Sequence, residues 1–481
     1  MVTRSIGGAC DLCVTSTPTL FHSLAIAALT APSWGADEPP SEIVIVKGDD
    51  ESADDETETS ASLTVIHLDD RLPISGDVAD ALETTTGVRI NRLGGMAGWS
   101  TVSIRGASSR QVAVYLDGVP LNPDGAAALN LSELPATAFD QIEVYRSNPP
   151  PQFGAAPMGG VVNMRTPRDP NALGASATVG QYDTHRASAF AAGGARVRNT
   201  TVDAWAAAEH LGTEGDFSFF QNRSTVFNLF DDSFERRQNN DKRQLNLLGR
   251  IRVGSDHGTA SVLHSTLTRD EGIPGPANAQ STGTRLETTR MLTALDAHTD
   301  GSWGRSRLTG WRIGTDELWD NRGGEVGVGT QWEDQTTDML GAQSTTELAV
   351  TARVIAILAG SIRGDRFERT DRLANRTDEP RTRTVWSASP GVRTQWFDDR
   401  IQLDGTAFIQ GIHNDAFGDQ GFDAVPDALR ATNTDLIAAK PRAGLLARVG
   451  RHSVIKATWG QGLRPPDFTE LSGNRGSIIG N

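Results

Sequence analysis

The side-chain types that perform covalent or metal chemistry are present in this chain, but they do not gather into a reactive motif. The nine histidines are scattered, without the HExxH spacing of a zinc protease. Gly323–Gly329 (GGEVGVG) is glycine-rich but lacks the following lysine of a phosphate-binding loop. Cys10 and Cys13 have CxxC spacing, but no second pair accompanies them. The sequence therefore predicts no enzyme, no catalytic residue, no resident metal ion and no cofactor.

Side chains suited to non-covalent binding stand in two loops that glycine and proline mark. These loops are Arg92–Ser100 (RLGGMAGWS) and Pro120–Ala127 (PLNPDGAA). Trp99 offers a surface for stacking, while Asn122 and Asp124 offer polar groups that can orient a ligand. The two loops are therefore candidates for recognition rather than for catalysis.

Bulk composition limits the possible classes. The 481 residues suffice for two or three domains, and the net charge of −15 argues against a nucleic-acid partner. No run reaches the roughly 18 apolar residues of a membrane-spanning helix, since the longest candidate, Leu348–Gly360, contains Arg353. A membrane β-barrel stays possible because its strands alternate and keep the mean hydropathy low.

The first 36 residues have the layout of an export signal. Arg4 gives a weak positive region, Leu20–Thr30 is mostly apolar, and small residues follow at Ala31–Ala36. A disordered tail is the alternative. Because both cysteines lie in this segment, the mature protein is expected to contain none, which is compatible with the periplasm.

Residues 37–61 have the composition of a linker that contains one isolated β-prone segment. Glu42, Ile43, Val44, Ile45 and Val46 form that segment. A run of acids without a base follows it: Asp49, Asp50, Glu51, Asp54, Asp55, Glu56 and Glu58. Such a run repels itself and stays extended. An isolated strand can dock on the sheet edge of another protein, although an edge strand of the next domain is the alternative.

Residues 62–168 are expected to form a compact α/β domain. Asp77 is the predicted N-cap of a helix over Val78–Thr85 that Gly87 ends, and Ser132 is the predicted cap of a helical turn near Leu131–Ala138. Alternating apolar residues predict the strands Leu63–Leu68, Val88–Asn91, Val102–Arg105, Val112–Leu116, Ile142–Arg146 and Gly160–Arg165.

From residue 172 onward, segments with a period of two dominate. Examples are Leu245–Val253, Ile401–Ile409, Ala443–Val449 and Ser453–Trp459. A soluble β-sandwich shows similar alternation. Turn lengths favour a barrel: Gly254–His257 and Gly450–His452 are short, whereas Leu211–Asp241, Thr315–Asp338 and His413–Lys440 are long.

Several motifs in the chain resemble those of TonB-dependent outer-membrane receptors. Val102–Gly106 (VSIRG) with Val112–Leu121 (VAVYLDGVPL) is similar to the family's first plug signature. Ile142–Arg146 (IEVYR), Phe153-Gly154 and Gly159–Thr166 (GGVVNMRT) are similar to its second. Glu42–Val46 resembles the energy-coupling box, and Leu463–Leu471 (LRPPDFTEL) resembles a barrel motif. The resemblance covers about residues 42–481.

The resemblance implies a mainly β fold with an N-terminal α/β plug domain inside a transmembrane antiparallel β-barrel. The family's barrel has about 22 strands, whereas residues 172–481 supply about 14 or 15. We therefore expect an incomplete, C-terminally truncated barrel. One departure is the proline run Pro149–Pro151, which follows Arg146 where the family usually has Arg-Gly-Pro. Because proline is stiff, this plug loop is expected to be rigid.

By resemblance, both candidate loops lie at the apex of the plug and face outward. The implied ligand-binding residues are Arg92, Trp99, Ser100, Asn122 and Asp124. The expected plug–barrel contacts, formed by side chains that can pair within a polar lumen, are Arg105, Glu143 and Arg146. Glu42–Val46 is the implied docking strand for a TonB-type inner-membrane energy-coupling protein.

The implied function is TonB-dependent active import of a scarce ligand, of the ferric siderophore or cobalamin class, across the cell outer membrane. Its partners would be the coupling protein, a small-molecule ligand such as a metal chelate, and outer-membrane lipid. The outer-loop aromatics Phe217, Phe219, Phe220, Trp319 and Trp332 are further candidates for ligand contact. A non-transporting adhesin or a ligand-sensing receptor on the same fold is the alternative.

Overall fold

The structure is a computed structural model of the chain. It describes residues 11–16, 61–68, 76–93, 98–122, 129–154, 159–167, 172–223, 227, 230–397, 400–415, 434–449 and 453–462. The predicted docking strand Glu42–Val46, the ligand candidate Asp124 and the motif Leu463–Leu471 lie outside these residues. Of the expected export signal, only residues 11–16 are described.

Most of the described chain forms one large curved sheet, which we call the wall. Consecutive strands pair antiparallel, as expected for strands joined by hairpin turns. Its main strands are β9 (Leu173–Val179), β10 (His185–Val197), β11 (Thr200–Thr213), β14 (Lys242–Ser255), β15 (Gly258–Gly272), β16 (Arg285–Gly301), β17 (Gly304–Asn321), β18 (Gln331–Thr351), β19 (Val354–Asp371), β21 (Arg381–Trp396), β22 (Ile401–Asp415), β23 (Thr434–Val449) and β24 (Ser453–Gly460). The short β20 (Arg376–Thr377) pairs with β19, and β1 (Asp11–Ser16) pairs with β24.

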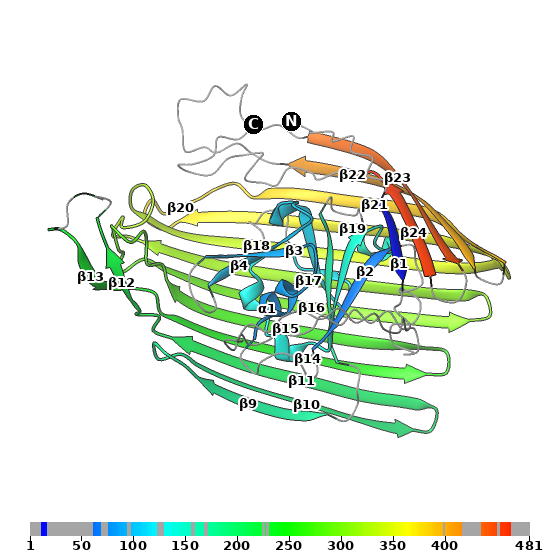
Figure 1. The fold of residues 1–481 in the computed structure, drawn as a ribbon, viewed down its shortest axis with the longest axis horizontal. Coiled ribbons are helices and arrows are strands. Elements are labelled where there is room, and N and C mark those ends of the chain that lie inside the picture. Colours follow the sequence, from blue (N-terminus) through cyan, green and yellow to red (C-terminus); the bar gives the residue numbers. More distant parts are fainter. Residues whose placement is uncertain are drawn as a thin grey trace, which may run out of the picture.

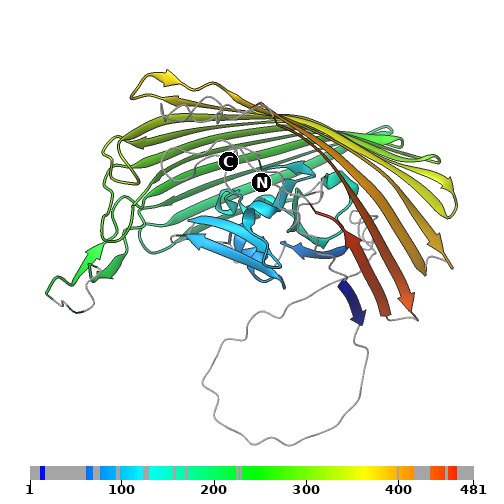
Figure 2. The ribbon, with the colours of Figure 1, turned by 90° about the horizontal axis from the view of Figure 1, so that it is seen from above.

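The wall has 15 strands in all, and it curls around the N-terminal domain without closing among the described residues (Figures 1 and 2). The strand β9 lies at one edge, and β1 lies at the other. In the unprocessed chain, β1 supplies backbone partners to the outer edge of β24. This strand lies within the expected export signal, residues 1–36, and is absent once that signal is removed.

Polar side chains are common on the concave side of the wall, and apolar side chains are exposed on its convex side. Along β14, the side chains of Gln244, Asn246 and Arg250 are buried toward the plug. Leu247 and Ile251 alternate with them and are 44% and 57% exposed. This arrangement is the reverse of a soluble sandwich, in which the apolar face would be the buried one. It confirms the alternation that the sequence indicated.

Turn lengths differ between the two rims of the wall. Only residues 256–257 separate β14 from β15, whereas residues 273–284 separate β15 from β16. The longest described excursion carries the hairpin β12 (Ser218–Gln221) and β13 (Ser233–Arg236), which projects from the long-loop rim (Figure 1). The predicted loop Thr315–Asp338 is shorter than expected, because β17 and β18 pair as far as Asn321 and Gln331.

The N-terminal domain, which we call the plug, contains a small mixed sheet. Its strand order is β2-β7-β8-β5-β6, in which β5 and β8 are parallel. The strands are β2 (Ser62–His67), β5 (Val112–Leu116), β6 (Val119–Pro120), β7 (Gln141–Ser147) and β8 (Gly160–Arg165). A separate hairpin joins β3 (Val88–Leu93) to β4 (Trp99–Ile104). Each strand that the sequence predicted in this region is present, with ends that differ by at most a few residues.

Helix capping in the plug follows the sequence in one place and departs from it in another. Asp77 caps α1 (Val78–Glu83) through a reciprocal capping box with Asp80. The short helix η2 (Leu131–Glu133) is capped by Asn130, so the prediction of Ser132 as the cap is wrong. The amide Oδ1 of Asn130 accepts from the Ser132 backbone N–H at 3.2 Å, which places Ser132 inside the turn. A second short helix, η3 (Ala136–Ala138), follows it.

The main hydrophobic core extends from the plug into the wall. Leu82 and Val144 of the plug belong to the same buried cluster as Trp205 and Trp311 of the wall. The fold therefore places the plug against the concave face of the wall, where side chains of the two parts share one interior (Figure 2).

Among the described residues, no helix combines the length and the apolar character needed to cross a membrane.

Candidate functional site

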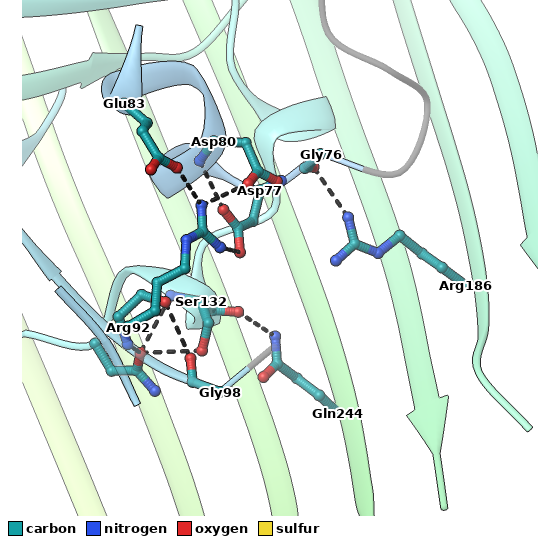
Figure 3. Close-up of polar contacts among 11 residues, drawn as sticks. Gly76, Asp77, Asp80, Glu83, Arg92, Gly98, Ser132, Arg186 and Gln244 are labelled. Carbon is teal, nitrogen blue, oxygen red and sulfur yellow. Dashed lines mark hydrogen bonds and ion pairs between the residues drawn. The ribbon is translucent and has the colours of Figure 1, made fainter. Parts of the chain in front are cut away.

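Arg92 lies near the end of β3, within a group of carboxylates on α1 (Figure 3). Its guanidinium is 2.5 Å from Asp80, 3.4 Å from Glu83 and 3.6 Å from Asp77. Burial by itself would lower the pKa of Arg92. The negative charges of Asp77 and Asp80 have the larger effect and raise the pKa of Arg92. Arg92 thus remains a cation, and its described contacts fasten the β3–β4 hairpin to α1.

Two other predicted ligand residues hold the plug backbone in place. Ser100 is buried; its N–H donates to Asn130 Oδ1 at 2.8 Å, and its hydroxyl donates to the Gly98 carbonyl at 3.1 Å. Asn122 accepts the Val114 N–H at 2.7 Å through Oδ1. Trp99, at the start of β4, is partly exposed and therefore retains surface for stacking. Of the described candidates, Trp99 fits direct ligand contact best.

The three predicted plug–barrel residues have contacts within the plug. Glu143 accepts from Asn163 Nδ2 at 2.8 Å and from Arg165 Nε at 2.9 Å. Arg146 donates to Thr64 Oγ1 at 2.5 Å, which ties β7 to β2. The Arg105 backbone N–H donates to the Gly87 carbonyl at 2.8 Å. Their role at the wall stays a prediction, whereas these bonds stabilise the plug itself.

A buried ion cluster joins the plug to the wall at Glu133. One carboxylate oxygen of Glu133 lies 2.6 Å from Arg269 of β15, and the other lies 2.8 Å from Arg290 of β16. Burial alone would raise the pKa of Glu133, but the two guanidinium groups prevail and lower it. Sequence analysis missed this residue. Its signal was an acid within the leucine-rich segment Leu129–Leu134 (LNLSEL).

Wall side chains also donate to backbone carbonyls of the plug. Arg186 Nη1 donates to the Gly76 carbonyl at 2.9 Å, and Gln244 Nε2 donates to the Ser132 carbonyl at 3.2 Å (Figure 3). Further donors of this kind, given with their acceptors, are Gln343 to Gly118, Arg307 to Asp117, Arg442 to Pro149 and Lys456 to Ala61. These bonds seat the plug without any backbone pairing between the described plug strands and the wall.

Two loops of the long-loop rim are joined by Glu325. Its carboxylate accepts from the Thr282 hydroxyl at 2.6 Å and from the Gly283 N–H at 2.8 Å. These hydrogen bonds lower the pKa of Glu325 to about 2. Asn321 supports the same junction, since its Oδ1 accepts from the Thr284 hydroxyl at 2.9 Å. The loops 273–284 and 322–330 therefore form one connected edge.

The outer-loop aromatics fall into two groups. Trp332 lies beneath the guanidinium groups of Arg322 and Arg372, at 4.7 and 5.1 Å from its ring centroid. Phe220 and Phe234 pair across the β12–β13 hairpin with ring centroids 5.5 Å apart, and both are exposed. Within the part of the chain that is described, no three His, Cys, Asp or Glu side chains are grouped to hold a metal ion.

This arrangement, a small mixed domain seated against the concave side of a large antiparallel sheet, defines a class of plugged barrel proteins. Residues 55–161 match the model of the "TonB-dependent Receptor Plug Domain". A curated relative, the vitamin B12 transporter BtuB of Vibrio vulnificus (strain YJ016), is 38% identical over 87 residues, which are 18% of this chain and 14% of the relative.

Solved structures share the fold. The copper transporter OprC is 13% identical with a TM-score of 0.64, and the match covers 86% of this chain and 64% of OprC. A mutant of the ferric enterobactin receptor PfeA from Pseudomonas aeruginosa is 14% identical with a TM-score of 0.63, and the match covers 85% of this chain and 63% of that receptor. The chain therefore spans less than two thirds of the length of each of these proteins.

The plug match and the relative identify the N-terminal domain as a plug of TonB-dependent receptors, and the shared fold agrees with this class. The resemblance stated from the motifs is thereby confirmed, as is the mainly β fold with an α/β plug. The proteins of this family are transporters and receptors of the cell outer membrane, and this location holds for the chain.

Proposed function

We propose that this protein carries out TonB-dependent active import of a scarce ligand across the outer membrane. The observation that carries the proposal is the seating of the plug, which side chains of the wall hold by hydrogen bonds and ion pairs. Such bonds can be broken one at a time when force is applied. Strand pairing between plug and wall would add a continuous ladder of backbone hydrogen bonds that the force would also have to break.

The proposed point of attachment for force is the docking strand Glu42–Val46. It precedes the acidic run, and the first described residue after that run, Ala61, lies where Lys456 of the wall donates to its carbonyl at 3.2 Å. In the proposal, ligand binding exposes the docking strand, and the inner-membrane coupling protein pairs with it by β-augmentation. Residues 1–36 serve as the export signal, and residues 37–61 as the linker.

The proposed ligand is a ferric siderophore or a cobalamin, taken up from the long-loop rim. Trp99 and Asp124 of the apex loops are the proposed contacts, with Arg92, Ser100 and Asn122 keeping those loops in position. Support comes from the names of the similar proteins, which include a vitamin B12 transporter and a ferric enterobactin receptor. Outer-membrane lipid is the proposed environment of the convex face.

Substitution by proline in the docking strand tests energy coupling. Proline removes the backbone donor that strand pairing needs. We expect Ile43→Pro and Val44→Pro to reduce accumulation of radiolabelled cyanocobalamin or ferric siderophore to the background of cells without the receptor. Binding of the same ligand at the cell surface should be unchanged. Ser52→Pro, in the linker but outside the docking strand, is the matched control. Uptake in the Ile43→Pro cells equal to that in the control would refute coupling through this strand.

The second candidate is a non-transporting adhesin or ligand-sensing receptor, which the exposed phenylalanines of the β12–β13 hairpin favour. Such a protein would bind its partner equally well when residues 42–46 are deleted, and the cell would accumulate no ligand. The uptake experiment above therefore separates the two candidates.

A further inference from the structure

Several cations on the concave face of the wall form ion pairs with carboxylates. Arg269 and Arg290 share Glu133, as described above. Arg393 lies 3.1 Å from Asp404, and Arg307 lies 2.7 Å from Asp296. This matching is expected, because a buried charge without a counter-charge is strongly destabilising.

Two neighbouring cations on β23 depart from this pattern. Lys440 and Arg442 are 2% and 8% exposed, so both are buried. Lys440 Nζ donates to Gln410 Oε1 at 2.8 Å, and Arg442 Nη1 donates to the Pro149 carbonyl at 3.3 Å. Among the described residues, Arg442 Nη2 has no acceptor. Neither cation forms an ion pair with a described carboxylate, and the protein groups that they contact are neutral.

Among the described residues of β23 and β24, no acid faces the plug. Asp404 of β22 does face it but is paired with Arg393. The concave side chains of β23 and β24 include Lys440, Arg442 and Lys456. The acid of β23 is Asp435, which is exposed and lies 2.6 Å from His413. β24 contains no acid. The described side chains of β23 and β24 that face the plug therefore include cations and no acid.

An aromatic ring fixes the position of the two cations. Phe408 of β22 is 1% exposed and pairs directly with Lys440 across the ladder. Lys440 Nζ lies 5.3 Å from its ring centroid, and Arg442 Cζ lies 5.7 Å from it. Both charged groups are thus held over one ring.

We propose that Lys440 and Arg442 form an oxyanion-binding site in the seam between the plug and β22–β23. A carboxylate oxygen placed there would accept from Arg442 Nη2 and neutralise the pair, and such charge-assisted bonds are the stronger kind. The inference rests on the proposed import function in one respect: it assigns carboxylate groups to the imported chelate, which would meet this site as it passes the plug.

Binding of citrate, a small tricarboxylate, to the purified full chain in detergent tests the site. Isothermal titration calorimetry should show saturable binding that weakens as sodium chloride is added. Arg442→Gln should raise the Kd about tenfold or more, because it removes a charged donor. Arg312→Gln is the matched control, since Arg312 is exposed and lies 3.0 Å from Asp338.

A second variant distinguishes a loss of citrate binding from a loss of the contact that holds the plug against the wall. Arg442 contacts the plug backbone, whereas Lys440 bonds to Gln410 within the wall. Lys440→Gln should therefore raise the Kd for citrate while hydrogen exchange of the plug amides stays as in the wild type. Absence of saturable binding in the wild type, or the same Kd in Arg442→Gln, Lys440→Gln and Arg312→Gln, would overturn the site.

Failure of this inference differs from failure of the proposed function. If the site is absent, Ile43→Pro still abolishes uptake while citrate binding does not depend on Lys440 or Arg442. If import is absent, Ile43→Pro has no effect on uptake, and the two cations still determine citrate binding.

Discussion

At the scale of single residues, the plug depends on charges whose partners come from distant parts of the chain. Glu133 lies 136 positions before Arg269, and together with Arg290 they form a buried three-residue cluster. Sequence patterns do not show such a pairing, because nothing local in the segment near Glu133 indicates which wall strand will face it. The cluster nevertheless determines the charge state of Glu133, whose pKa it lowers.

We expect Glu133→Gln to lower the free energy of unfolding by about 3–5 kcal/mol, because it leaves buried guanidinium groups without their carboxylate. The pKa of Glu133 is lowered on folding, so its stabilisation is complete above pH 4.5 and is lost as the pH falls through the lowered pKa. Denaturant unfolding at neutral and acid pH measures both effects. Glu235→Gln, which breaks the ion pair with Arg223 at the projecting β12–β13 hairpin, should cost only about 0–1 kcal/mol; equal losses in the two variants would contradict the prediction.

The contact that Glu325 makes between the outer loops is also expected to depend on pH. Its pKa of about 2 lies below the ordinary 4.5, so the junction between loops 273–284 and 322–330 should be intact above pH 4.5 and weaken as the pH falls toward 2. Hydrogen exchange of the Gly283 amide, which donates to Glu325 at 2.8 Å, reports this change. In Glu325→Gln the amide should exchange faster at neutral pH. Protection that is independent of both pH and the substitution would show that another contact holds the loops.

At the scale of secondary-structure elements, the plug depends on the close approach of β7 and β8. Gly160 begins β8 with φ of 115°, and a Cβ placed there would lie 2.4 Å from the Tyr145 carbonyl oxygen of β7. A side chain at this position is therefore excluded by both the backbone conformation and the neighbouring strand. The predicted strand Gly160–Arg165 is correct, but the sequence alone did not show why it starts with glycine.

Gly160→Ala should prevent correct pairing of β7 with β8 and leave the plug sensitive to protease. Gly106→Ala is the control, since Gly106 also has a positive φ, 79°, but no atom lies within 4 Å of the added Cβ. Backbone strain alone should cost the control about 1–2 kcal/mol, with the plug still folded. Limited proteolysis of the two variants in the same detergent makes the comparison. An intact plug in Gly160→Ala would refute the close-approach argument.

At the scale of the whole molecule, the wall exposes many apolar side chains on its convex face and buries many polar ones beside the plug. Leu247 on β14 points away from the plug, whereas Asn246 beside it is buried. An apolar convex surface of this kind is stable in lipid, where polar groups would be costly. This arrangement agrees with the outer-membrane location of the family.

Leu247→Arg should destabilise the protein in a bilayer by about 2–4 kcal/mol, because it places a charge on the convex face near the middle of β14. The same change at Ser255, the last residue of β14 beside a short turn, should cost only about 0–1 kcal/mol near the interface. Folding into lipid vesicles, followed by denaturant titration, measures the difference. Similar costs at the two positions would argue against lipid contact at Leu247.

Local features of this protein follow directly from its side-chain pattern. The period of two in Leu245–Val253 required a strand with two different faces, and Asp77 before an apolar helix required an N-cap; both are local consequences of side-chain chemistry. The plug motifs sufficed to indicate the family. The ends of β17 and β18 were not determined in this way, because cross-strand pairing extended them into the segment expected to be a loop.

Which distant groups meet is evident only from the three-dimensional fold. It assigned Ser100 and Asn122 to backbone contacts within the plug, and it joined Glu133 to Arg269 and Arg290 of the wall. It also left Lys440 and Arg442 together without a described carboxylate. The physical reason is that burial and ion pairing depend on distance in space. Curvature of the wall sets that distance, and local sequence does not encode it.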